Sequence, residues 1–242
     1  MKVSLFITCL ADNMFPEVGE SVVRVLNKLD VEVDFPAGQT CCGQPAFNSG
    51  YKKEAIDVAK HTIEVFENSE YVILPSGSCT GMVHHYYPEL FKDEPVWQER
   101  ANDLINRTYE FTQFLVNVLK VDDIGARFEK KVTYHSSCHM SRLLGVKDEP
   151  ITLLKNVSGV ELVELPYSYD CCGFGGTFAM KMPDISVAMV NEKVEHVLST
   201  DAEVLVSADM GCLMNIGGRM NRLGQEMGIM HIAQVLDEGV RT

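Results

Sequence analysis

The sequence predicts an α/β fold made of two tandem Rossmann-like halves, related by a pseudo-two-fold, with mainly parallel sheets and crossover helices. Short apolar runs alternate along the chain with segments of helical spacing, which is typical of parallel strands joined by crossover helices. Cys41-Cys42-Gly43 returns as Cys171-Cys172-Gly173, with single cysteines at similar distances on both sides. Such a repeat indicates a duplicated structural unit.

In the first half, apolar runs predict strands near residues 3–8, 31–35 and 71–74. Apolar residues recur at helical spacing from Val18 to Leu29 and again from Ala55 to Phe66. The expected order is therefore strand, helix, strand, helix, strand, with the Cys-Cys-Gly loop after the second strand.

The segment from Pro95 to about Lys120 carries apolar residues on one stripe and no cysteine. This spacing predicts one long helix that connects the halves. We therefore divide the chain into an N-terminal repeat (1–94), a helical connector (95–130) and a C-terminal repeat (131–242).

The second half repeats the order of the first. Strands are expected near 132–135, 160–165 and 204–207, a helix near 184–198, and a last strand and helix within 228–236.

All eight cysteines of the chain fall into two matching sets. The first set is Cys9, Cys41, Cys42 and Cys79, and the second is Cys138, Cys171, Cys172 and Cys212. The first two cysteines are 32 residues apart in one set and 33 in the other, and the last two are 37 and 40 apart. Because the single cysteines follow strand ends, we expect each set to converge at the carboxyl edge of its sheet.

Clustered thiols of this kind suit zinc or the iron of an iron–sulfur cluster. Consecutive cysteines face one site only if the backbone turns, and Gly43 and Gly173 are free to take a positive φ there. Gly175 and Gly176 would let backbone N–H groups approach cluster sulfurs. We also expect helices that start just after Cys138 and Cys212 to lower the pKa of those thiols.

Other interpretations of these residues remain open. Single buried cysteines often serve as small core residues, and the vicinal pair Cys41-Cys42 could act as a thiol–disulfide switch. His84, His85, His135 and His139 lie near the cysteines and could be ligands, proton carriers, donors to sulfur or ordinary polar neighbours. No histidine is predicted as a ligand while four cysteines are available.

Composition narrows the choice of partners and compartment. A formal charge of −13 and a pI near 4.9 disfavour nucleic acids and anionic membrane surfaces. No apolar run approaches the roughly 20 residues that cross a bilayer. The apolar residues before Cys9 match those before Cys138, so we expect a strand rather than a leader peptide, and a cytoplasmic protein.

Arg142 and Arg219 lie near Cys138 and Cys212 and could pair with a substrate carboxylate. Surface charge is the more common role of such arginines.

The paired motifs resemble the cysteine-rich CCG-domain family, which includes one of the subunits of heterodisulfide reductase and the iron–sulfur subunit of glycolate oxidase. Flanking residues are similar to the lactate-utilisation branch: Thr40-Cys41-Cys42-Gly43-Gln44-Pro45, Ser137-Cys138-His139-Met140 and Gly211-Cys212-Leu213-Met214. The resemblance covers the chain from end to end. It implies a subunit of a bacterial complex that oxidises L-lactate to pyruvate, together with a ferredoxin-like iron–sulfur subunit and a third subunit.

In this family the repeat often ends Cys-x-x-Cys, giving a fifth thiol per site, whereas Met82 and Asn215 stand at those positions here. The resemblance therefore implies four-thiolate sites, with one or two cubane [4Fe–4S] clusters or with zinc in one or both. The function expected first is an iron–sulfur redox subunit that relays electrons, rather than a complete enzyme. The alternatives are a zinc-stabilised scaffold subunit and a metal-free vicinal-dithiol protein.

Replacing Cys171 or Cys172 by serine should empty the C-terminal site and leave the N-terminal site occupied, because the two sets share no cysteine. Metal analysis of both purified variants, beside the unaltered protein, measures this. Loss of metal from both halves together would contradict two separate sites.

Overall fold

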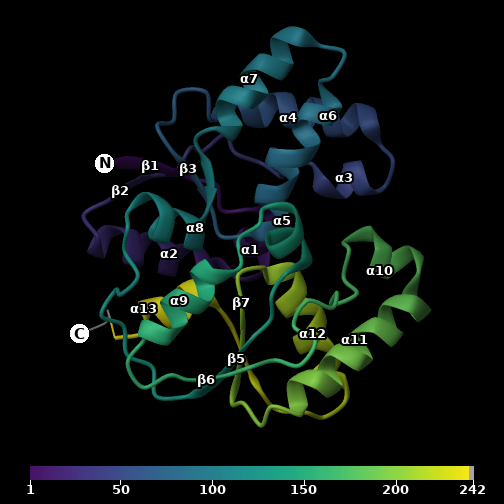
Figure 1. Cartoon of the computed structure of the whole chain (residues 1–242). Coiled ribbons are helices and arrows are strands. Elements are labelled where there is room, and N and C mark those ends of the chain that lie inside the picture. Colours follow the sequence, from purple (N-terminus) through teal and green to yellow (C-terminus); the bar gives the residue numbers. More distant parts are fainter. Residues whose placement is uncertain (240–242) are drawn as a thin grey trace.

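Two four-stranded sheets lie at the centre of the molecule, one in each half (Figure 1). The computed structural model describes residues 1–239, and the last three residues of the predicted segment 131–242 lie outside it. The first sheet has the strand order β2-β1-β3-β4 and the second has β6-β5-β7-β8, and every pairing is parallel. The same order in both sheets confirms the α/β fold with tandem Rossmann-like halves.

The strands are short. They are β1 (Lys2–Leu5), β2 (Glu32–Asp34), β3 (Val72–Leu74), β4 (Thr108–Glu110), β5 (Lys131–Tyr134), β6 (Glu161–Val163), β7 (Val204–Ser207) and β8 (Gly228–His231).

Helices connect the strands, and three of them are π-helical turns, labelled η. The first half contains α1 (Cys9–Met14), α2 (Pro16–Lys28), α3 (Gln44–Asn48), α4 (Lys52–Val65), α5 (Gly77–Gly81), η1 (Met82–Tyr86), α6 (Tyr87–Leu90), α7 (Pro95–Ile105), α8 (Phe111–Gln113) and η2 (Phe114–Val118). The second half contains η3 (His139–Leu143), α9 (Asp148–Asn156), α10 (Thr177–Lys181), α11 (Pro183–Leu198), α12 (Met210–Arg222) and α13 (Ile232–Asp237).

The central strands and longer helices follow directly from the apolar pattern. All three residues of β3 are buried, as expected for a strand covered on both faces. Helix α2 starts with Pro16 in its first turn, where no backbone N–H is needed. Its residues Val18, Val22 and Val25 form a fully buried stripe.

The expected continuous helix from Pro95 to about Lys120 is wrong. Helix α7 ends at Ile105, and β4 then pairs in parallel with β3 as the fourth strand of the first sheet. Thr108 and Tyr109 are residue types that favour strands. The apolar stripe seen in the sequence belongs to separate helices on either side of this strand. The division of the chain at residues 94 and 130, into two repeats and a connector, stays a prediction.

One apolar core runs through both halves. It joins Leu5, Val25 and Phe114 of the first half to Val132 and Leu205 of the second. A smaller core around Phe66 and Tyr87 lies on the other face of the first sheet. The two halves are therefore packed against each other through a shared apolar interior.

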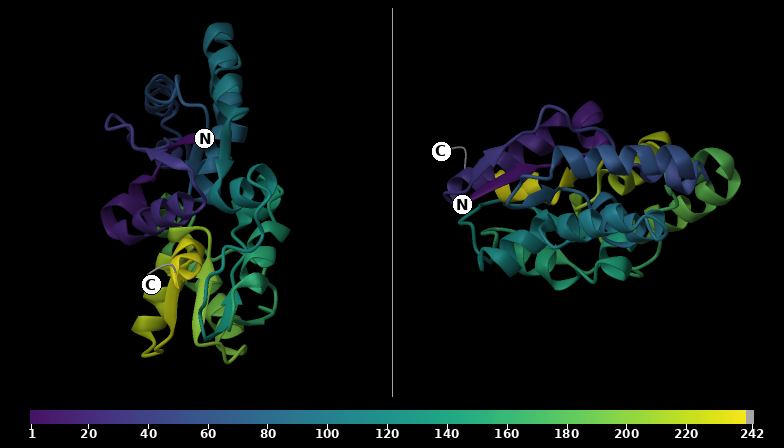
Figure 2. Two further views of the ribbon diagram at one scale, coloured as in Figure 1. Left: turned by 90° about the vertical axis from the view of Figure 1, so that its left-hand side faces the viewer. Right: turned by 90° about the horizontal axis from the view of Figure 1, so that it is seen from above.

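The junction between the halves also contains specific helix contacts. Helix α2 packs against α13, and α5 packs against η3; the views in Figure 2 show α13 (yellow) beside α2 (purple). Buried Asp237 of α13 accepts hydrogen bonds from Ser21 Oγ at 3.0 Å and Arg24 Nε at 2.8 Å on α2.

Nowhere in residues 1–239 does a helix combine the length and apolar character needed to cross a bilayer.

A second polar link lies where the first turns of α5 and α12 meet. Asp209 is buried and caps α12 by accepting a hydrogen bond from the Gly211 N–H at 3.1 Å. Its other oxygen crosses to the first half and accepts from the Ser78 N–H at 2.8 Å. Because α5 and α12 carry Cys79 and Cys212, this carboxylate holds both thiol-bearing turns in place.

Replacing Asp209 by alanine should lower the free energy of unfolding by about 1–3 kcal/mol, because it leaves buried N–H groups without an acceptor. Urea unfolding of the metal-free protein measures the change. Asp57→Ala, on the exposed face of α4, is the matched control. A shift no larger than that of the control would contradict the role given to Asp209.

Candidate metal centres

The first cysteine set is assembled from segments that end at the carboxyl edge of the first sheet. Cys9 is the first residue of α1, Cys41 and Cys42 precede α3, and Cys79 lies in the first turn of α5. The Sγ atoms of Cys9 and Cys41 are 3.5 Å apart, and those of Cys42 and Cys79 are 3.2 Å apart. The fold thus brings these four thiols together.

The second set repeats this arrangement. Cys138 directly precedes η3, Cys171 and Cys172 lie in the loop after β6, and Cys212 lies in the first turn of α12. The Sγ atoms of Cys172 and Cys212 lie within 4.8 Å of each other, and Cys138 lies close enough to Cys171 for the pKa of each thiol to depend on the other. The expected convergence therefore occurs in both halves, while metal binding by the cysteines stays a prediction.

Each set has a covered side and an accessible side. Cys42 and Cys79 are buried, as are Cys172 and Cys212, whereas the other cysteines of each set are half-buried. A cavity of about 360 Å³ opens onto Cys9 and Cys41. Thiols on this side can be reached by a metal ion or a partner protein.

The glycines after the double cysteines make the required turn. Gly43 has a φ of 88° and Gly173 a φ of 81°, which confirms the expected positive φ. A Cβ on Gly173 would lie 2.8 Å from the Ser186 carbonyl oxygen. Gly175 and Gly176 also have positive φ values, of 50° and 61°; their approach to a cofactor remains a prediction.

The Gly173 N–H donates to the Cys171 Sγ at 3.4 Å. A backbone N–H therefore already points at one thiol of the set, while the contact expected from Gly175 and Gly176 to cluster sulfurs stays a prediction.

Hydrogen bonds between thiols decide which sulfur carries charge. Those from Cys42 and then Cys9 lower the pKa of Cys41 to about 3, and those from Cys138 and then Cys172 lower the pKa of Cys171 to about 2. The same bonds, followed by burial, raise the pKa of Cys9 and Cys138. Without a cation, thiols donate to a single thiolate, and further deprotonation is opposed by repulsion between sulfurs.

The expectation that a helix start lowers the pKa of Cys138 is therefore wrong, because the thiol donates its proton to Cys171. Cys212, unlike Cys138, does not precede its helix, since α12 begins at Met210.

The four histidines near the cysteines occupy different environments. The ring of His84 contacts the Thr108 carbonyl at 2.9 Å, and His85 is exposed. His139 Nδ1 lies 3.5 Å from the Cys138 Sγ. His135 is fully buried, and neither ring nitrogen has a hydrogen-bond partner within the described part of the chain.

A buried polar group without a partner costs about 1–3 kcal/mol. Burial, and then the nearby charge of Lys193, lower the pKa of His135 to about 3, so the ring is neutral near pH 7. The sequence placed His135 with the other histidines, because nothing in it shows the burial of the ring.

The two sets also differ in the group that holds the double-cysteine loop. Asn215 Nδ2 donates to the Cys172 carbonyl at 2.8 Å. In the first half, Met82 is fully buried, and Tyr87 Oη donates to the Cys42 carbonyl at 3.0 Å. The sequence revealed neither contact, because Tyr87 and Asn215 stand at different distances from their cysteines.

Four convergent sulfur donors, two of them buried, fit a thiophilic metal such as zinc or iron.

Arg142 is exposed, donates to the Tyr169 carbonyl and lines a cavity of about 610 Å³ with Lys147 and Lys155. Arg219 donates from Nε to Asn191 Oδ1 at 2.6 Å.

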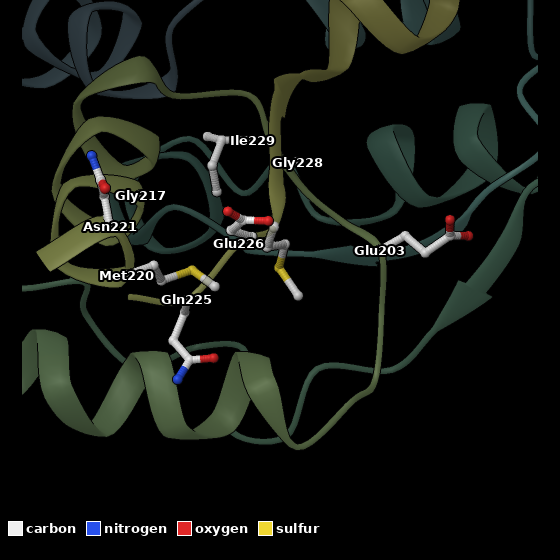
Figure 3. Close-up of a pocket in the computed structure, with 9 residues that line it drawn as sticks. Glu203, Gly217, Met220, Asn221, Gln225, Glu226, Gly228 and Ile229 are labelled. Carbon is white, nitrogen blue, oxygen red and sulfur yellow. The ribbon is translucent and has the colours of Figure 1, made fainter. Parts of the chain in front are cut away.

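A further cavity, of about 570 Å³, lies between α12 and β8 (Figure 3). It is lined by Glu203 and Gly228, which stand at the amino ends of β7 and β8. Its position at the edge opposite the cysteines separates it from the thiol chemistry.

Comparisons with known proteins match both thiol sets. A family model, CCG, described as a cysteine-rich domain, matches residues 3–84 and 132–217, and each segment contains one complete set. Lactate utilization protein A 2 of Bacillus cereus (strain 03BB102) is 57% identical over 240 residues, covering 99% of both chains. Lactate utilization protein A 1 of Bacillus mycoides (strain KBAB4) is 58% identical over 238 residues, covering 98% of this chain and 97% of its own.

The fold has a counterpart among solved structures. A hypothetical protein from Helicobacter pylori superposes with a TM-score of 0.70 at 8% identity. The match covers 97% of this chain, which spans 48% of that protein's chain. At this identity the likeness shows the fold alone.

Binding of Zn²⁺ to the metal-free protein should release protons, and its apparent affinity should rise with pH. Cys9 and Cys42 have raised pKa values, so both still hold protons at neutral pH and must lose them to become ligands. Calorimetric titrations in buffers of different ionisation enthalpy should show that each set releases at least two protons when Zn²⁺ binds.

Cys42→Ser is the matched variant, since it removes one of these protons from the first set only. Equal heats in all buffers, or an affinity that falls as pH rises, would contradict this distribution of protons.

Proposed function

The chain belongs to the family of proteins with cysteine-rich CCG domains, and from this premise we propose that it is an iron–sulfur redox subunit of a complex oxidising L-lactate to pyruvate. Both thiol sets, each complete within one matched segment, support a metal-binding role in each half. The relatives named Lactate utilization protein A, similar over nearly the whole chain, support lactate as the substrate of the complex.

In this proposal each four-cysteine set holds its cluster through thiolates supplied by separate segments of the chain. A bound [4Fe–4S] cluster would accept and give up one electron at a time. Cys42 and Cys79 shield the inner side, and so do Cys172 and Cys212. The half-buried cysteines face outward, where a redox partner could approach.

The observation that carries the proposal is the duplicated contact pattern between thiols. Cys9 lies against Cys41 and Cys42 against Cys79 in the first half; in the second half Cys172 lies within 4.8 Å of Cys212, and Cys138 interacts electrostatically with Cys171. Packing alone does not require the corresponding cysteines to lie together in both halves. Two metal sites of four thiolates each do require it.

Oxidation of the hydroxy acid takes place, in this proposal, in an assembly with a ferredoxin-like iron–sulfur subunit and a third subunit, in the cytoplasm. The cavity lined by Arg142, Lys147 and Lys155 groups these three positive side chains with one acidic residue, Glu164, on an otherwise acidic protein. Such a surface suits a carboxylate or an acidic segment of a partner.

Two other functions have specific support. A scaffold subunit stabilised by zinc is supported by the four-thiolate donor sets, which are typical of structural zinc sites. A metal-free dithiol protein is supported by Cys41 and Cys171, whose pKa values are lowered and whose side chains are half-buried.

Anaerobically purified or reconstituted protein should contain iron and acid-labile sulfide and, after reduction, give an electron paramagnetic resonance signal. Zinc without iron would favour the scaffold, and neither metal would favour the dithiol protein. Lactate oxidation is expected from the assembled complex and not from this subunit alone. Protein that carries no iron or sulfide after reconstitution would exclude the proposed function.

A further inference from the structure

His135 lies at the carboxyl end of β5, and hydrogen bonds hold its backbone there. Its backbone N–H donates to the Val206 carbonyl at 2.8 Å, and its own carbonyl accepts from Ser207 Oγ at 2.8 Å. These bonds continue the pairing with β7 beyond the last residue of the strand. The backbone of His135 is therefore held in place by the sheet, and the residue is 0% exposed.

Neither nitrogen of this ring has a partner within residues 1–239. His231 gives an internal comparison, since it is equally buried and ends β8. Its Nδ1 accepts a hydrogen bond from the Ala233 N–H at 3.1 Å and caps α13, and only its Nε2 has no partner within residues 1–239. The ring of His135 caps no helix and makes no hydrogen bond in the described residues, although buried polar groups almost always have a partner.

The second thiol set is the neighbour of this ring. A ring nitrogen of His135 and the Sγ atoms of Cys172 and Cys212 all lie within 4.8 Å of one another, and all three residues are buried. Donors bound to one tetrahedral metal at 2.0–2.3 Å lie roughly 3.3–3.8 Å apart. Small side-chain movements would therefore bring all three atoms onto one metal.

The first half has a different residue at the matching position. Phe6 follows β1 as His135 follows β5, and its N–H donates to the Ile73 carbonyl at 2.9 Å. Its ring packs on Phe66 with centroids 4.9 Å apart. The same place in the fold therefore accepts an apolar ring, and a histidine is not required there for packing.

We propose that His135 is a metal ligand of the C-terminal site, where its imidazole joins Cys172 and Cys212 among the donors, while the N-terminal site has thiolates alone. The lone pair of a neutral imidazole nitrogen forms the bond to the metal, and no electron is transferred. The proposal rests on metal binding by the second set, as the proposed function does.

A ligand from His135 would also give the two sites different reduction potentials. An imidazole that takes the place of one thiolate lowers the negative charge of a site, as in clusters where histidines replace cysteines and the reduction potential is higher. The C-terminal site is then the stronger electron acceptor of the pair.

Cadmium-113 is the probe, because Cd²⁺ prefers soft thiolate donors and its nuclear resonance distinguishes sulfur from nitrogen ligands in each site separately. The metal-free protein is loaded with Cd²⁺ and compared with His135→Phe, which copies the residue of the matching position. His139→Gln is the matched control, since His139 is the other histidine beside a cysteine of this set.

Unaltered protein and His139→Gln should give one all-thiolate resonance and one resonance displaced by nitrogen. In His135→Phe the displaced resonance should move to the all-thiolate region, and Cd²⁺ binding at the second set should weaken at least about tenfold. Circular dichroism of the metal-free variant should be unchanged, which separates loss of a ligand from loss of the fold.

Identical spectra for His135→Phe and the unaltered protein would overturn the proposal, and so would loss of the displaced resonance in His139→Gln alone. Absence of Cd²⁺ from the second set would remove this inference and the metal-binding premise together. Two Cd²⁺ resonances in a protein that takes up no iron or sulfide would exclude only the proposed redox function.

Discussion

Parallel pairing of short strands is the constraint on which both thiol sites depend. Residues that follow neighbouring parallel strands emerge at one edge of the sheet. Pairing of Leu5 with Ile73 and of Tyr134 with Val206 therefore directs the segments after β1 and β3, and after β5 and β7, to a common place. Cysteines 32 and 37 residues apart in the sequence meet only because this register holds.

A second constraint is the charge that accumulates when four thiols gather. The pKa values of Cys41 and Cys171 are lowered because neighbouring thiols donate to them, and those neighbours keep their protons for the same reason. Each set thus holds one negative charge easily and further charges only beside a cation. The remaining thiols of each set therefore lose their protons only when a cation binds.

The two halves have equivalent positions in the fold, but some of these positions carry different residues. Strand ends, glycine turns and cysteines agree between the halves, whereas Phe6 stands where His135 does in the other half, and Tyr87 and Asn215 hold their loops from different helices. Asp209 and the shared apolar core tie the halves into one body. The two sites can therefore differ in chemistry while they remain fixed relative to each other.

The sequence alone determined the two thiol sets, the turns at Gly43 and Gly173, and the alternation of strands and helices, because these depend on local spacing and backbone freedom. It did not reveal β4, since apolar residues of separate helices on both sides of Thr108–Glu110 fall on one apparent stripe. The burial of His135 and the proton on Cys138 were decided only by tertiary structure. Both depend on which side chains from distant segments surround the group, and no spacing in the sequence records that.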